Sequence, residues 1–313
     1  MNFGCLQKSP QAVESDNYGD QSCRTSCNLF GGDRNGNIYG NDSPEKILSE
    51  VEQDINRNLY SLSMKDREAV FNDIHGVSED MNETPEMINL ACAQLEMEVC
   101  KDKFSSSSMR LVFQTAPTYI RSLYLRFLRN DSFQISQTAE RMKRHFDVKL
   151  ELFGIDRLNR DISLADFTLD DRRTLEHGFY QLLPKRDTAG RAIFMKIWYH
   201  QFFVEKINVS RIFWYILNTA AIDEETQKKG MVFVLYNVAS DWIKRMDVDL
   251  FLRILKVRNA SPIKLMGAHY CFKDPAFGAL INIVNQTVER PIRVRTRMHR
   301  GTYDLSQEQI MAS

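Results

Sequence analysis

The apolar run Met231–Val238 constrains the fold of this chain more than any other segment. It has the length of a β-strand and offers apolar side chains to both sides of such a strand. A run of this kind is typical of a strand that is buried on both faces, as in a parallel sheet covered by helices. We therefore expect the chain to build its main core around a covered sheet.

The hydrophobic pattern around this run alternates between strand and helix. A hairpin is predicted from two strand-like stretches, Phe179–Pro184 and Arg191–Lys196, which have a polar turn between them. The other predicted elements are a helix over 207–228, the strand 231–238, a helix over 249–258, a strand over 263–272, a helix over 275–285 and a strand over 292–299. This alternation predicts an α/β fold with a mixed or parallel sheet and helices packed on it.

Helical patterns dominate the part of the chain before Gly178. Helix starts are predicted at Pro85, at Pro117, near residue 135 and after Thr168. Thr168 is expected to cap the fourth helix together with Asp171. We expect residues 84–165 to form a helical bracket and residues 166–313 to form an α/β lobe.

Residues 1–83 are rich in Ser, Asn, Asp and Gly, as in the stretch Gly31–Lys46. Because it has few apolar residues, this part cannot bury enough apolar surface to offset the entropy lost on ordering. It is therefore predicted to be largely disordered. One exception is predicted from Pro44 to Tyr60, where apolar residues recur at helical spacing and Ser43 can cap the helix.

The overall composition excludes several classes of protein. Lysine plus arginine and aspartate plus glutamate both number 41, so no global field favours nucleic acid. The six cysteines are scattered and predict a reducing compartment rather than a disulfide framework. The chain has no recognisable signal peptide, metal-ligand spacing or catalytic motif, which predicts a cytoplasmic protein that is no enzyme and needs no cofactor.

Two short motifs resemble parts of the CRAL-TRIO family. The helical part of these proteins is similar to one stretch of this chain, Leu125-Arg126-Phe127-Leu128-Arg129, which is followed by Phe133 and Ala139. The pattern Leu183-Pro184, Asp187 and Gly190-Arg191 resembles the first hairpin of their lipid-binding lobe. With the order of the later elements, the resemblance covers about residues 85–300. The family includes the phosphatidylinositol-transfer, tocopherol-transfer and retinaldehyde-binding proteins.

The resemblance implies that the lobe holds one lipid in an apolar pocket between the sheet and a mobile gate helix. The implied pocket residues are Phe194, Phe202, Phe213, Trp214, Val232, Val234 and Tyr236. The implied gate helix carries Phe277, Leu280, Ile281 and Val284. The alternative for each of these residues is an ordinary place in the core. The implied partners are a hydrophobic small molecule or phospholipid and, transiently and peripherally, a membrane surface.

The predicted last strand, 292–299, alternates apolar and basic residues. Its basic face would carry Arg293, Arg295 and Arg297, which could contact anionic headgroups or a membrane surface. The alternative is a solvated sheet edge whose charges prevent aggregation.

Two functions therefore stay open. The first is the binding of a small hydrophobic lipid, with or without transfer between membranes. The second is a CRAL-TRIO-like scaffold or regulatory module that binds a protein. The family usually continues past its last strand through a further helix, and this sequence ends at Ser313. A C-terminally truncated lobe and a diverged, non-transferring member are both compatible with that difference. The sequence predicts no oligomeric state.

Overall fold

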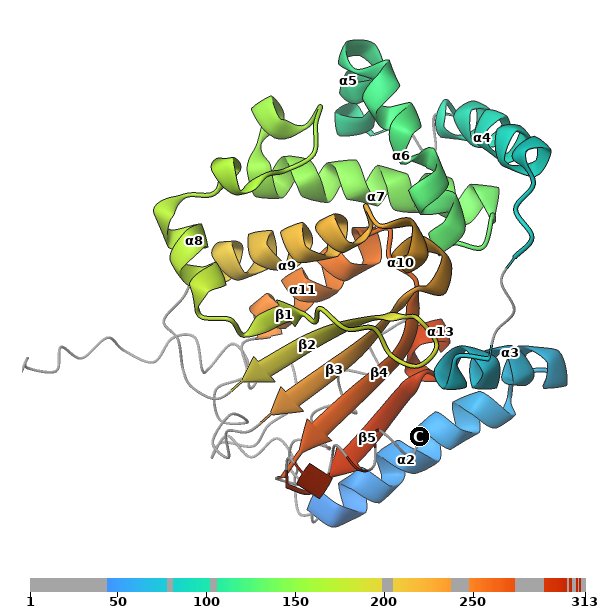
Figure 1. Ribbon diagram of the computed structural model, residues 1–313, viewed down its shortest axis with the longest axis vertical. Coiled ribbons are helices and arrows are strands. Elements are labelled where there is room, and N and C mark those ends of the chain that lie inside the picture. The colour runs from blue at the N-terminus through green and yellow to red at the C-terminus, as the bar shows by residue number, and fades with distance from the viewer. Residues whose placement is uncertain are drawn as a thin grey trace, which may run out of the picture. The chain divides into compact units, whose positions relative to one another are not determined.

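A five-stranded sheet forms the centre of the α/β lobe (Figure 1). The computed structural model describes residues 44–77, 81–101, 106–198, 205–237, 248–273, 290–302, 304, 305, 308 and 310. The strands are β1 (Tyr180–Leu182), β2 (Ala192–Trp198), β3 (Met231–Asn237), β4 (Leu265–Phe272) and β5 (Thr296–Arg300), in that order across the sheet. β1 pairs antiparallel with β2, and the later pairs are parallel. The predicted hairpin, the buried strand and the α/β class are confirmed.

One face of the sheet, called the first face below, is covered by two helices. These are α9 (Lys206–Ala220) and α11 (Val248–Ala260), which lie together on the same side of the strands (Figure 1). Phe194 and Phe233 point to this face and pack against Phe213 of α9. All three rings are buried, so the apolar residues of β2 and β3 form the main core here.

The helical bracket packs on the far side of these helices. It contains α4 (Pro85–Val99), α5 (Ser107–Thr115), α6 (Pro117–Asn130) and α7 (Ile135–Phe153). α7 contacts both α9 and α11. The buried ring of His145 fixes this contact, with Nδ1 3.2 Å from the Ala260 carbonyl oxygen and its centroid 4.4 Å from Trp214. Burial holds the pKa of His145 well below its ordinary value, so this contact uses a neutral imidazole.

Before residue 84, the prediction of disorder is wrong for residues 64–75, which form a helix. The helix α2 (Pro44–Tyr60) has its predicted bounds, but α3 (Met64–His75) was not predicted. α3 contacts β4, and it buries Val70 and Ile74 against Val294. These apolar contacts come from the far end of the sequence, so the local composition of residues 64–75 could not reveal them. Residues 1–43 lie outside the described residues, and residues 42–313 form one compact unit.

Two further boundaries differ from the sequence prediction. The helix predicted over 207–228 is interrupted after Ala220, and α10 (Glu224–Lys229) begins anew. Asp223 caps α10 by accepting the Thr226 backbone N–H at 2.7 Å, which explains the break. The strand predicted over 292–299 is also shorter. Residues Arg290–Arg293 form a helical turn, α13, and the strand begins at Thr296.

The connection between bracket and lobe agrees with the predicted capping. Two short 3-10 turns, η2 (Ile155–Arg157) and η3 (Leu164–Asp166), lead into α8 (Leu169–Glu176). Thr168 and Asp171 form a reciprocal capping box at the start of α8. Among the described residues, no helix combines the length and hydropathy needed to cross a membrane.

Candidate functional site

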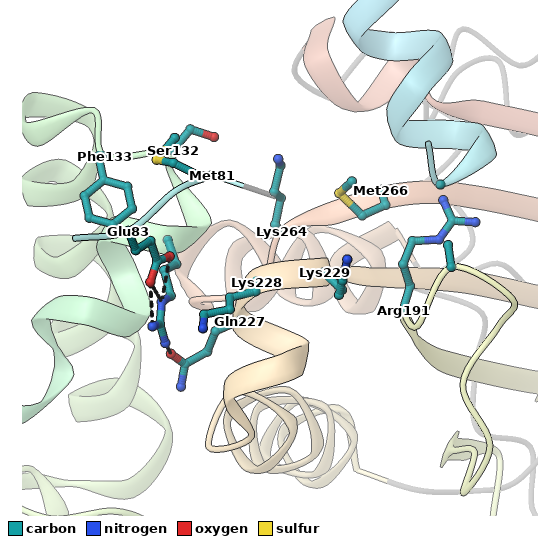
Figure 2. A pocket seen from close by; sticks show the side chains of 13 residues that line it. Met81, Glu83, Ser132, Phe133, Arg191, Gln227, Lys228, Lys229, Lys264 and Met266 are labelled. Atoms are coloured by element: carbon teal, nitrogen blue, oxygen red, sulfur yellow. Dashed lines mark hydrogen bonds and ion pairs between the residues drawn. The ribbon is translucent and has the colours of Figure 1, made fainter. Parts of the chain in front are cut away.

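A cavity of about 120 Å³ lies where the amino ends of β2, β3 and β4 meet α3, α6 and α10 (Figure 2). Its described lining residues are Gly76, Met81, Glu83, Arg129, Ser132, Phe133, Ala189, Arg191, Gln227, Lys228, Lys229, Lys264 and Met266. In Figure 2, Glu83, Phe133 and Gln227 lie toward one end and Arg191 and Met266 toward the other. The cavity thus joins the helical bracket, the N-terminal segment and the edge of the sheet.

The described lining has more basic than acidic side chains, and Arg129, Arg191 and Lys228 are ion-paired. It contains five cationic side chains and one carboxylate, that of Glu83. Three of the cations follow from the sheet topology, because Arg191 directly precedes β2, Lys229 precedes Gly230 and β3, and Lys264 directly precedes β4. Neighbouring parallel strands bring their amino ends to one edge, so these charges gather there. Such a concave, basic surface favours an anionic group.

Arg129 is the most enclosed cation of this cavity, with a side chain that is 6% exposed. Its Nε donates to both carboxylate oxygens of Glu83 at 3.0 Å, and its Nη2 donates to Glu83 Oε2 at 2.6 Å. The other contacts are Nη1 to Gln227 Oε1 at 2.7 Å and Nη2 to Glu224 Oε1 at 3.0 Å. The last arginine of the Leu-Arg-Phe-Leu-Arg motif therefore connects the bracket to α10 and to residue 83.

Arg191 is held by the turn of the hairpin. Asp187 accepts the backbone N–H groups of Ala189 and Arg191 at 3.0 and 2.8 Å, and the Arg191 Nε at 2.6 Å. This turn chemistry explains the Asp-x-x-Gly-Arg pattern. Arg191 Nη1 also donates to the Asp73 and Ile74 carbonyl oxygens, which caps the end of α3. The motif thus orders both the hairpin and one wall of the cavity.

The second face of the sheet, opposite α9 and α11, carries an apolar surface. Three neighbouring pairs contribute to it, namely Ile193 with Val232, Met195 with Val234 and Ile197 with Tyr236, and Met266 and Cys271 of β4 belong to the same cluster. Among the described residues, Ile310 is the one member of this cluster that lies outside the sheet. This face is therefore apolar across β2 and β3, and Val232, Val234 and Tyr236 are buried in it.

Met266 connects this apolar surface to the basic cavity. The register of β3 and β4 shifts at this point, because Met231 pairs with Leu265 while Val232 pairs with Gly267. Met266 is the extra residue of this bulge, and bulges re-aim side chains in this way. It belongs to the apolar cluster of the second face and also lines the cavity. Met266, which is 4% exposed, is thus common to the apolar cluster and to the cavity lining.

The far edge of the second face is polar. His269 pairs in register with Arg297, and Cys271 with His299. The two imidazoles are stacked and buried, with His269 Nδ1 2.8 Å from His299 Nε2. Burial and the neighbouring Arg297 lower the pKa of both histidines, and that of His269 falls to about 3. Burial thus favours the neutral form of both imidazoles.

The structure does not bring the predicted pocket residues together. Phe194, Phe213 and Trp214 are buried in the core of the first face. Val232, Val234 and Tyr236 lie on the second face. The two groups are separated by the sheet itself, because successive side chains of a strand point to opposite faces. Phe202 and the predicted gate residues Phe277, Leu280, Ile281 and Val284 lie outside the described residues.

The three arginines expected on one strand face do not share such a face. Arg293 belongs to the helical turn α13, and Arg295 precedes β5. Arg295 Nη2 pairs with the buried Asp73 of α3 at 2.5 Å. Arg297 is half-buried and donates to the Thr296 carbonyl oxygen at 2.9 Å. The prediction of an exposed basic stripe is wrong, because the chain there begins as a helix and Arg295 holds α3.

Sequence reasoning missed the basic cavity. Arg129 and Arg191 belong to the two short motifs of the sequence. Glu83, Lys229 and Lys264 belong to no motif. The sequence does contain a usable pattern, namely one cation within two residues before the start of each of three neighbouring strands. It could be interpreted only after the parallel order of β2, β3 and β4 was assumed.

A second cavity, of about 20 Å³, lies between α6, α7 and α9 beside Lys149. Lys149 Nζ donates to Tyr119 Oη at 2.8 Å and to the Leu158 carbonyl oxygen at 3.1 Å. Burial lowers the pKa of this lysine to about 7. The space is sufficient for about one water molecule, so this is a structural site.

Within the described parts of the chain, no cluster of His, Cys, Asp or Glu has the arrangement of a metal site. No known protein family matches the chain, and no curated protein matches it.

Proposed function

We propose that this protein binds an amphipathic lipid with an anionic headgroup and does no chemistry on it. The headgroup occupies the basic cavity, and an apolar chain extends over the second face of the sheet. The observation that carries the proposal is the double role of Met266, which belongs to the apolar cluster and to the cavity lining. An amphipathic ligand is the class of molecule that needs these two surfaces side by side.

The size of the cavity supports a headgroup rather than a whole ligand. Complete sites for drug-sized molecules usually measure about 300–1,000 Å³, and this cavity is about 120 Å³. It accommodates a group such as a phosphate or carboxylate. Lys264 makes no ion pair with any described residue, so its charge is available to such a group.

The apolar chain supplies the affinity in this proposal. Each methylene removed from water contributes about 0.8 kcal/mol, so a chain of about ten buried methylenes contributes about 8 kcal/mol. We propose that binding and release take place peripherally and transiently at the cytoplasmic surface of membranes. This proposal requires no cofactor.

Native mass spectrometry of the purified protein, followed by uptake from liposomes, tests the function. We expect a retained lipid with a negatively charged headgroup. Val234→Trp places an indole on the second face and should abolish uptake while the far-ultraviolet circular dichroism stays unchanged. The matched control is Leu90→Trp on the exposed side of α4, which should bind like the wild type.

Two results would contradict the proposal. One is a protein that never carries or takes up lipid. The other is lipid binding that Val234→Trp leaves intact. A stable protein–protein complex without any lipid would instead favour the scaffold function.

A further inference from the structure

The carboxylate of Glu83 occupies the position in which Arg129 would hold an anion. Both side chains are enclosed, with 9% of the Glu83 side chain and 6% of the Arg129 side chain exposed. The carboxylate accepts from Nε and Nη2 of the guanidinium at 2.6–3.0 Å. This two-point geometry is the one that arginine uses for carboxylates and phosphates.

Glu83 has no other hydrogen-bond partner among the described residues. It directly precedes Thr84, whose side chain caps α4 through the Met87 backbone N–H. Arg129, in contrast, is also held by Gln227 and by Glu224 of α10. Rotation of the Glu83 side chain would therefore break its three hydrogen bonds to Arg129 and leave the contacts of Arg129 with Gln227 and Glu224 in place.

A buried guanidinium without a carboxylate carries a large desolvation cost. The remaining acidic neighbour, Glu224, has a side chain that is 64% exposed and is shared with Lys228. It neutralises Arg129 only in part. An anion on this side of Arg129 therefore compensates its charge, and Glu83 and a ligand anion would compete for the same donors, Nε and Nη2.

We infer that Glu83 is an internal competitor of the anionic ligand, which binds by displacing the Glu83 carboxylate from Arg129. The inference rests on the proposed function, and it adds that the protein limits its own affinity for phosphate-bearing ligands. Membrane lipid, present at a high local concentration, overcomes the competitor. Dilute free phosphate does not.

The test is a calorimetric titration of the full chain with water-soluble dihexanoyl phosphatidic acid and, separately, with inorganic phosphate. Glu83→Gln keeps the shape and one hydrogen-bond acceptor but removes the charge. It should bind the short-chain lipid about tenfold more tightly than the wild type, or better, since charge-assisted hydrogen bonds are worth about 1.5–3 kcal/mol. Glu83→Ala should show the same gain if Glu83→Gln is poorly folded.

The matched control is Glu96→Gln. Glu96 also accepts from Nε and Nη2 of an arginine of α6, Arg121, but on an exposed surface with side chains 38% and 54% exposed. The Glu96→Gln variant should bind the short-chain lipid with the same affinity as the wild type. A gain for phosphatidic acid alone would identify a lipid headgroup as the displacing anion, and an equal gain for inorganic phosphate would identify free phosphate.

The inference is overturned if the wild type binds the lipid and both Glu83 variants bind it no more tightly. In that case Glu83 is a structural partner of Arg129, and the proposed function stands. If neither the wild type nor the variants bind either probe, both the inference and the proposed function are contradicted.

Discussion

The burial of Lys149 predicts that the stability of this protein depends on pH. Burial lowers its pKa from 10.5 to about 7 in the folded state. Between these two values the unfolded chain holds the proton and the folded protein does not. The free energy of unfolding therefore rises with pH, by up to about 1.4 kcal/mol per pH unit from this group. From pH 7 to 8.5 the contribution of Lys149 should reach about 1–2 kcal/mol.

Urea unfolding of the wild type and of Lys149→Met at pH 7.0, 7.75 and 8.5 measures this contribution. The difference between the two proteins isolates Lys149 from other groups, such as Lys196, whose pKa burial lowers to about 8. Lys143→Met, on the more exposed side of α7, is the control and should follow the wild type. Parallel curves for wild type and Lys149→Met would refute the reasoning.

Three smaller predictions concern the parts that surround the cavity. Asp73→Asn weakens the ion pair with Arg295, so hydrogen exchange in α3 should accelerate while that in α7 stays unchanged. Gly76→Ala should destabilise the protein by roughly 1–3 kcal/mol in thermal unfolding, because Gly76 has φ +67° and an added Cβ would lie 2.2 Å from Ala189 Cβ. Thr168→Ala removes the capping hydroxyl of α8 and should cost about 1 kcal/mol, whereas Thr168→Ser should restore most of it.

The sequence predicted the elements whose causes are local. Thr84, Pro117 and Thr168 mark helix starts by capping and by the fixed φ of proline, and the structure has helices at these places. The run Met231–Asn237 contains enough apolar side chains for both faces of a strand, so its burial could be predicted without knowing its neighbours.

Features that depend on distant contacts could not be predicted in this way. α3 looks polar in isolation, and it is stabilised by Val294 and Arg295, more than 200 residues away. The cavity depends on the same kind of information. Its cations are spread from Arg129 to Lys264, and only the parallel order of the strands and the packing of α6 on α10 bring them together.

The described residues of the predicted pocket lie on both faces of the sheet for a simple geometric reason. Phe194 and Val234 lie on adjacent strands but point to opposite faces, and residue type alone does not show which face a given side chain joins. Once the register is known, the apolar surface of the second face reduces to the alternate residues of β2 and β3 together with Met266.

The central claim is that an apolar chain lies on the second face while an anionic headgroup fills the basic cavity. Photocrosslinking with a phosphatidic acid that carries a diazirine in its acyl chain tests this most directly, with the labelled peptides identified by mass spectrometry. We expect labels on Ile193, Val232 and Val234, and their loss in Lys264→Glu at the cavity. Labelling confined to the exposed helices α4 and α8, or labelling of the second face that Lys264→Glu does not reduce, would contradict the account.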